Sequence, residues 1–155
     1  MKCIYKLVAY VLLVSISLGC FAQQMVQTPA DLLTVCQKDE QFIGKPLKTL
    51  FNQIKPPIIL TLADGGSVEQ APHFTFFFTS VQVYEKYRQQ DKFPLRIRVY
   101  VKEIFKWKWV ERNRSIGHYL DWLKEDEEKY CNLTVTAIRV VGDYDPCDYE
   151  FDINL

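Results

Sequence analysis

The chain has 155 residues, 48% of them hydrophobic, and its 19 basic and 19 acidic side chains balance to a formal net charge of zero. This length suits a single domain with a hydrophobic core. The lack of net positive charge argues against nucleic acid as a partner.

An export signal is predicted at residues 1–22. Two lysines precede an apolar run at residues 7–18, and small residues follow it up to Ala22. This is the layout of a secretory signal peptide, and the run is shorter than the roughly 20 residues that a membrane-spanning helix needs. We therefore expect cleavage after Ala22, which leaves a mature domain at residues 23–155.

Cys20 offers an alternative outcome for this leader. Residues 17–20 resemble the bacterial lipoprotein motif, in which the cysteine becomes a lipid-anchored N-terminus, although Ser17 stands where the motif prefers an aliphatic residue. In style the leader resembles signal peptides of Gram-negative bacteria, so the expected destination is the periplasm, the envelope or the medium. No second apolar run follows, and we expect no transmembrane span in the mature chain.

Three cysteines remain in the mature chain: Cys36, Cys131 and Cys147. An exported domain can hold disulfides, and three thiols allow one internal bridge. If residues 133–141 form a strand, Cys131 and Cys147 lie at its opposite ends, roughly 30 Å apart at about 3.3 Å per residue, which is beyond disulfide reach. Cys36 is therefore the predicted partner of either Cys131 or Cys147. The alternative is three buried free thiols.

Two short helices are predicted before the first strand. Residues 28–31, Thr-Pro-Ala-Asp, are typical of a helix start, with a capping hydroxyl, proline at the first helical position and an early carboxylate. This helix should reach about Gln37. A second helix should begin near Gly44 and end at the Pro56–Pro57 pair. Its apolar residues share one helical face, and they are Leu47, Leu50, Phe51 and Ile54.

Three strands should follow. Residues 58–62 and 73–84 read as strands on either side of a turn at residues 63–67. From Leu95 to Trp109 apolar residues alternate with basic ones, and an unbroken strand of this length would span about 50 Å. Because strands are rarely so long, we expect a bend or bulge near Lys102–Glu103.

The last predicted elements are a helix and two strands. Asn113 or Ser115 would cap the helix, and the charged stretch 124–129 would end it. Residues 133–141 and 149–155 would pair as a hairpin. The predicted order is therefore ααβββαββ: one α+β domain with a mainly antiparallel sheet of about five strands and helices packed on one face.

Sequence signals for catalysis are few. The mature chain has only two histidines, His73 and His118, and no nucleophile elbow, zinc motif or phosphate-binding glycine loop. A pairing of Cys131 with His118 would activate a thiolate, but no local pattern places the two residues together.

A metal site is conceivable at the C-terminal turn. Asp143, Asp145 and Asp148 supply the oxygen ligands that calcium prefers, without the glycine and glutamate spacing of an EF-hand. The alternative is that Asp148 and the acidic residues after it form the solvent-facing side of a terminal strand.

Charge is unevenly distributed along the chain. Residues 85–114 hold ten basic and four acidic side chains, whereas residues 115–155 hold three basic and ten acidic ones. One explanation is internal, since a basic strand face at residues 96–108 would pair with the acidic face of the last hairpin. The other is an anion-binding surface. Trp107 and its neighbours would then form a stacking platform with a basic rim, unless they pack beneath helices.

These observations predict a small exported, non-enzymatic protein without a cofactor, which presents an interaction surface in the cell envelope or outside it. The partner would be an envelope protein or an anionic glycan. The predicted contact residues are Arg96, Arg98, Lys106, Trp107 and Lys108. The alternative is a metal-dependent or hydrolytic envelope enzyme with a site near the acidic C-terminal hairpin or His118.

Overall fold

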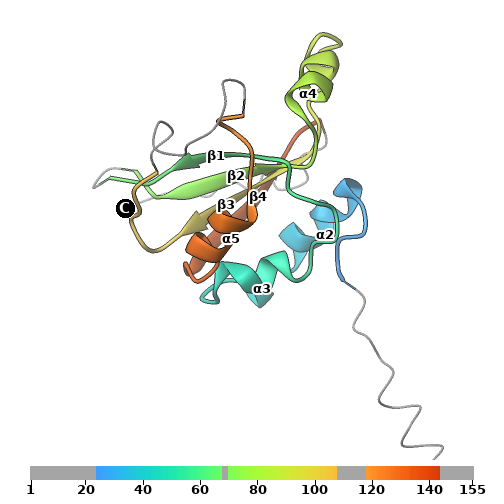
Figure 1. Cartoon of the computed structure of the whole chain (residues 1–155). Helices are drawn as coiled ribbons and strands as arrows, with labels where there is room; N and C mark the ends of the chain where they lie inside the picture. Colours follow the sequence, from blue (N-terminus) through green and yellow to red (C-terminus); the bar gives the residue numbers. More distant parts are fainter. Residues whose placement is uncertain (1–23, 68–69, 108–117, 144–155) are drawn as a thin grey trace, which may run out of the picture.

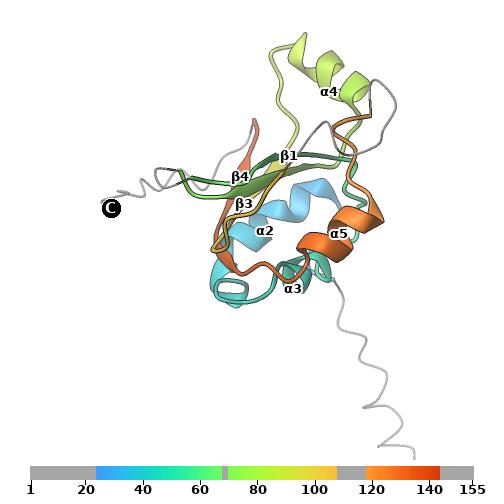
Figure 2. The ribbon, with the colours of Figure 1, turned by 60° about the vertical axis from the view of Figure 1, so that its left-hand side comes forward.

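The computed structural model of the chain describes residues 24–67, 70–107 and 118–143. In this part of the chain, four antiparallel strands form one sheet with the order β1-β2-β3-β4. Figures 1 and 2 show helices α2, α3 and α5 on one face of the sheet and α4 at one end, away from them. The predicted α+β class is confirmed, with four strands in place of about five. Among the described residues, no helix is long and apolar enough to cross a membrane.

The N-terminal helix begins where the sequence predicts it. A 3₁₀ turn, η1 (Pro29–Asp31), runs directly into α2 (Leu32–Gln37). The Thr28 backbone N–H donates to Asp31 Oδ2 at 2.8 Å, and the Thr28 hydroxyl donates to the same oxygen at 3.1 Å. These bonds lower the pKa of Asp31 below its ordinary value, and the bond from the Thr28 backbone has the largest effect. The capping residues thus organise the entry to α2.

Helix α3 (Leu47–Phe51) follows a second 3₁₀ turn, η2 (Asp39–Gln41). Its apolar face lies on the core as predicted, because Leu47, Leu50 and Ile54 are buried and Phe51 packs against them. The helix is short, and the chain then leads into the first strand.

Each strand pairs with the next one along the chain. The strands are β1 (Leu60–Asp64), β2 (His73–Phe77), β3 (Arg96–Val101) and β4 (Val135–Val141). On β3 the alternation has the predicted consequence: Ile97, Val99 and Val101 are buried, whereas Arg96 and Arg98 face the other way. A register irregularity falls between Tyr100 and Val101, and β3 ends there. The expected long strand is therefore interrupted slightly before Lys102–Glu103.

The prediction of one strand from residue 73 to residue 84 is wrong beyond Phe77. Ser80 is the N-cap of helix α4 (Val81–Arg88), and its Oγ accepts a hydrogen bond from the Val83 N–H at 3.4 Å. The alternating Val81 and Val83 suggested a strand, but no residue of α4 is buried. Because these residues have no buried face that would fix them in a strand register, the N-cap at Ser80 favours a helix.

The third helix was also misplaced by the sequence prediction. Helix α5 (Lys124–Tyr130) consists of the charged stretch that was expected to end a helix. Its first turn is acidic, which suits the positive end of the helix dipole, and Asp126 accepts from the Leu123 N–H at 2.9 Å. The predicted caps Asn113 and Ser115 lie outside the described residues, as does the predicted strand at 149–155.

The chain turns at residues 119–120 and forms no helix there, and residues 120–122 lie along the edge of β1. The Thr61 N–H donates to the Leu120 carbonyl at 2.7 Å, and the Trp122 N–H donates to the Ile59 carbonyl at 3.0 Å. This segment therefore forms hydrogen bonds with the backbone at the edge of β1 and places Trp122 in the core. Edge pairing with a distant segment outweighs the helical spacing of its apolar residues.

An aromatic cluster fills the space between the sheet and α5. Phe74 is fully buried at its centre and stacks on Phe105 with ring centroids 4.5 Å apart. The rings of Tyr130, Trp122 and Trp107 lie 5.3–6.0 Å from the Phe74 ring. The segment after β3 is thus held on the helix-covered face of the sheet.

The described cysteines differ in state. Cys36 in α2 is disulfide-bonded, whereas Cys131, at the end of α5, is a free thiol. Pairing of Cys36 with Cys131 is therefore wrong for this structure. Of the two partners that the sequence left open, Cys147 remains, and it lies outside the described residues; the Cys36–Cys147 bridge stays a prediction.

Candidate anion-binding face

The face of the sheet opposite α2, α3 and α5 carries the most concentrated positive charge of the described strands. We call this surface the outer face. It consists of the outward-pointing residues of β2, β3 and β4: His73, Thr75, Phe77, Arg96, Arg98, Tyr100, Ala137, Arg139 and Val141. The strand register arranges these residues in three cross-strand rows, and the middle row contains two arginines.

The middle row places like charges opposite each other. Thr75, Arg98 and Arg139 are Cα partners across β2, β3 and β4. The Arg98 Nε donates to Thr75 Oγ1 at 3.1 Å. Like charges directly opposite each other on one sheet face are destabilising, so this row does not arise from a requirement of sheet pairing.

Arg96 is held at the α4 end of the outer face. Its Nη1 donates to the Tyr84 hydroxyl at 3.0 Å, and its guanidinium carbon lies 5.8 Å from the Phe77 ring centroid. The Tyr84 ring in turn packs edge-on against Phe77 at 5.6 Å. Helix α4 therefore provides the side chain that orients Arg96.

Arg139 is positioned by an aromatic ring. Its guanidinium carbon lies 5.8 Å from the Tyr100 centroid, and the Tyr100 ring lies 5.4 Å from that of His73. Cation–π contacts of this kind orient a guanidinium without neutralising it.

Within the described part of the chain, no carboxylate lies within 4.0 Å of Arg96, Arg98 or Arg139. The described ion pairs are elsewhere: Arg88–Glu85 in α4, Lys124–Glu128 in α5 and the His118–Asp121 contact. All three arginines are partly buried and held by neutral partners. They retain full charge because a guanidinium stays protonated in proteins.

The five predicted contact residues do not share one surface. Arg96 and Arg98 lie on the outer face, whereas Trp107 packs on the opposite side, 5.4 Å from the Tyr130 ring. The Lys106 carbonyl accepts a hydrogen bond from the Tyr130 hydroxyl at 3.2 Å, so its backbone also lies on that side. Lys108 lies outside the described residues.

Arg139 was missed by the sequence prediction. The signal lay in β4, where Ile138 and Val140 are buried and Arg139, between them, has the opposite orientation. Its place beside Arg98 depends on the pairing of β3 with β4, which the local sequence does not show.

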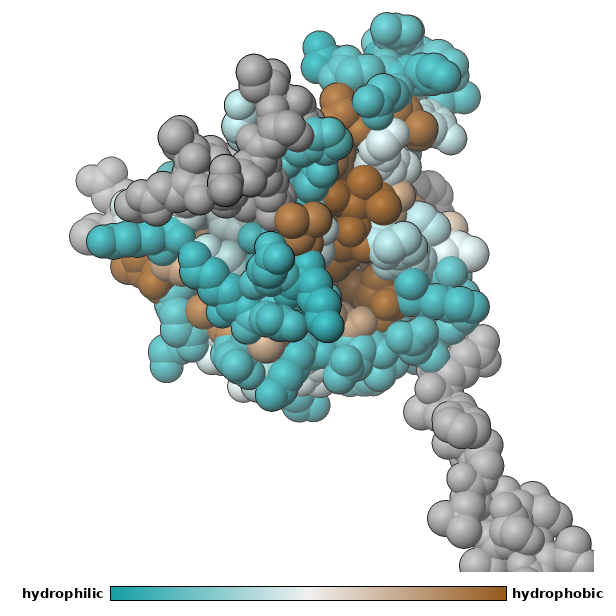
Figure 3. Space-filling model, viewed as in Figure 1, coloured by the Kyte–Doolittle hydropathy of each residue, from teal (hydrophilic) through white to brown (hydrophobic). Residues whose placement is uncertain are grey.

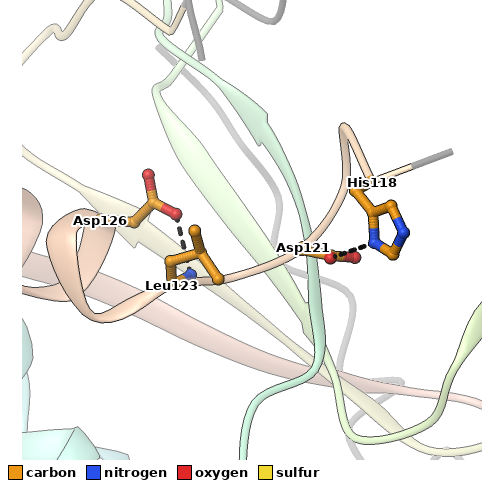
Figure 4. Close-up of polar contacts among 4 residues, drawn as sticks. All are labelled: His118, Asp121, Leu123 and Asp126. Atoms are coloured by element: carbon orange, nitrogen blue, oxygen red, sulfur yellow. Dashed lines mark hydrogen bonds and ion pairs between the residues drawn. The ribbon is translucent and has the colours of Figure 1, made fainter. Parts of the chain in front are cut away.

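His118 belongs to an exposed contact with Asp121. The His118 Nδ1 lies 2.7 Å from Asp121 Oδ2 (Figure 4), and the histidine side chain is 62% exposed. Cys131, the thiol considered for it, contacts the Glu128 carbonyl, with its sulfur 3.6 Å from that oxygen. In the described ranges no hydrogen bond joins His118 to Cys131, so these residues do not form an activated pair there.

The predicted metal ligands are only partly within the described residues. Asp143 accepts a hydrogen bond from the Phe93 N–H at 2.7 Å, and its own N–H donates to the Phe93 carbonyl at 3.0 Å. Asp145 and Asp148 lie outside the described residues. Over the part of the chain that the structure describes, no group of three or more potential metal-ligating side chains is found.

Two hollows flank the segment that pairs with β1. One, about 310 Å³, is lined by residues that include Phe51, Pro57 and Trp122. The other, about 180 Å³, lies between Leu62 on β1 and Val81 on α4. Figure 3 shows apolar surface between α4 and α5. Neither hollow contains a catalytic constellation of titratable side chains among its lining residues.

Comparison of the chain with models of protein families, with characterised proteins and with solved structures finds no match. The geometry of the described residues therefore carries the functional argument.

Proposed function

We propose that this chain is a small exported binding protein whose outer face holds an anionic partner in the cell envelope or outside it. One observation carries the proposal: Arg96, Arg98 and Arg139 lie on one face of the sheet, each held by a neutral partner. An anion bound there would offset the repulsion between the like charges of Arg98 and Arg139 and supply an opposite charge that no described residue provides within 4.0 Å.

The arrangement favours binding because the guanidinium groups are already oriented. Thr75 holds Arg98 and Tyr84 holds Arg96, so less side-chain freedom is lost when a ligand binds. A guanidinium also presents paired N–H donors that match the geometry of a carboxylate, sulfate or phosphate.

Export remains part of the proposal and rests on the leader at residues 1–22. The disulfide bond at Cys36 supports it, because structural disulfides persist in oxidising compartments and are rare in the cytosol. Lipidation at Cys20 would place the same domain on a membrane surface.

The test uses the mature protein and two double variants that lose the same charge. Arg98→Gln/Arg139→Gln changes the outer face, whereas Lys86→Gln/Arg88→Gln changes the exposed side of α4. The wild-type protein and the α4 variant should be retained on immobilised dextran sulfate to the same salt concentration. The outer-face variant should elute at clearly lower salt, because fewer arginines hold it to the sulfate groups and salt screens the remaining attraction sooner.

Equal elution of the two double variants would contradict the proposal, because retention would then follow net charge alone. Thermal melting of each variant serves as the folding control. The outer-face variant should melt no earlier than wild type, because it removes two like charges from directly opposite strand positions.

A further inference from the structure

We infer that the anionic partner is an acidic saccharide, whose carboxylates bind Arg98 and Arg139 while a sugar ring packs on the neighbouring aromatic pair. The inference rests on the proposed function and assigns its ligand class. It combines the charged middle row of the outer face with the row beside it, which contains His73, Tyr100 and Ala137.

The charged groups suit a carboxylate. Arg98 uses its Nε for Thr75, which leaves both terminal nitrogens available for the two oxygens of one carboxylate. Arg139 lies against the Tyr100 ring, and its guanidinium has no hydrogen bond or ion pair to another described residue, so its N–H groups are available within this part of the chain. Bidentate pairing of a guanidinium with a carboxylate is a strong and directional contact.

The adjacent row suits a sugar ring. The His73 and Tyr100 rings lie 5.4 Å apart at 40°, and Tyr100 is only two residues from Arg98 along β3. Two residues of a strand span roughly 6–7 Å. On β4 the partner of Tyr100 is Ala137, whose side chain is a single methyl group. An aromatic side chain with a polar end offers both an apolar ring face and a hydroxyl to a saccharide.

An acidic peptide fits this surface less well. Peptides that bind sheets through their backbone add to a strand edge and not to a sheet face; the β1 edge is paired with Leu120 and Trp122, and the β4 edge is paired at Val135 with Gly44 and Lys45. The outer face instead presents aromatic side chains with hydroxyl groups: Tyr84 lies beside Arg96, and Tyr100 beside Arg139.

The experiment compares three ligands by titration calorimetry with the mature protein. The ligands are an oligogalacturonate, the same oligosaccharide as its neutral methyl ester, and polyglutamate with a matching number of carboxylates. Wild type should bind the oligogalacturonate most tightly. The methyl ester and the Arg98→Gln/Arg139→Gln variant should each weaken binding by about tenfold or more, because charge-assisted hydrogen bonds are lost.

The tyrosine variants separate sugar packing from charge. Tyr100→Ala should weaken oligogalacturonate binding by about twofold to tenfold and weaken polyglutamate binding less, because polyglutamate loses only the orientation that the ring gives to Arg139. Tyr100→Phe should retain saccharide binding, which also controls for loss of folding at this position.

Two negative outcomes are distinguishable. If polyglutamate binds as tightly as the oligogalacturonate and Tyr100→Ala alters neither, the saccharide assignment is wrong while the anion-binding function stands. If no polyanion binds in a way that depends on Arg98 and Arg139, the proposed function fails, and the saccharide assignment fails with it.

Discussion

Glu103 links the end of β3 to the start of β4, and its replacement tests how strongly that link holds the sheet together. One carboxylate oxygen accepts from the Thr134 N–H at 2.7 Å, and the other accepts from the Thr134 hydroxyl at 2.6 Å. Glu103→Gln keeps one acceptor oxygen and loses the second and the charge. Hydrogen bonds to a charged group contribute about 1.5–3 kcal/mol. Because Glu103 is only partly buried, we expect a loss of about 1–2 kcal/mol in unfolding free energy.

The same contact has a defined pH dependence. Burial raises the pKa of Glu103, but the hydrogen bonds from Thr134 and the nearby charge of Lys102 outweigh it and hold the pKa below its ordinary value of 4.5. A carboxylate with a lowered folded pKa stabilises the protein above its unfolded pKa, and the contribution is lost as the pH falls through the folded pKa. The difference between wild type and Glu103→Gln should therefore be constant above about pH 6 and shrink below about pH 4.5.

Urea unfolding followed by tryptophan fluorescence measures this difference at pH 7 and at successive acidic values. Glu40→Gln is the matched control, because Glu40 is an exposed glutamate in the η2 turn. This control should change the unfolding free energy by less than about 0.5 kcal/mol. The reasoning is refuted if Glu103→Gln behaves like Glu40→Gln at pH 7, or if its deficit persists unchanged below the folded pKa.

Three further predictions concern the core and the covalent framework. Non-reducing peptide mapping of alkylated mature protein should recover Cys36 linked to Cys147; alkylation of Cys36 in the native protein would contradict it. Phe74→Ala should lower the unfolding free energy measured in urea by about 3–5 kcal/mol, because Phe74 is fully buried among five aromatic rings. The control Ile104→Ala, at a site 66% exposed, should change it by less than about 0.5 kcal/mol. Gly65→Ala should lower the melting temperature with a cost of about 1–3 kcal/mol, since an added Cβ would lie 1.8 Å from the Phe105 carbonyl oxygen; an unchanged melting curve would refute that close approach.

The elements that the sequence predicted well are those with local signals. The Thr28–Asp31 cap is a contact over three residues, and it marks the start of the first helix without help from the rest of the chain. The alternation in β3 is equally local, because every second residue from Ile97 to Val101 is aliphatic and buried, while Arg96 and Arg98 point the other way. Both features are visible in a short window of sequence.

The errors arose where a short apolar pattern fits more than one structure. Val81 and Val83 alternate as in a strand, yet Ser80 caps a helix there. Residues 118–123 have helical spacing, yet Asp121 forms a bridge with Leu60 of β1, 61 residues earlier in the chain. Such choices depend on which distant segment supplies the burial and the hydrogen bonds, and a local pattern does not contain that information.

The candidate site shows the same division. Arg96 and Arg98 follow from the alternation of a single strand. Trp107 was assigned with them as a stacking platform beside Lys106 and Lys108, although along a continuous strand it has the parity of Ile97 and Val99. In the structure Trp107 joins the Phe74 cluster, which is the alternative of packing beneath helices. Arg139 enters the site only through the pairing of β3 with β4.

A substitution at Arg139 separates the effect of the outer face on stability from its effect on anion binding. If folding alone determined this position, an acidic residue opposite Arg98 would be preferred, because opposite charges across strands stabilise a pair by roughly 0.2–1 kcal/mol and like charges destabilise it. Arg139→Glu should therefore raise the unfolding free energy by up to about 1 kcal/mol in urea and at the same time abolish retention on dextran sulfate. A variant that is less stable than wild type would show that Arg139 serves the fold, and a variant that is more stable but still retained would show that the anion binds elsewhere. Gain of stability together with loss of binding is the outcome expected of a residue placed for a ligand.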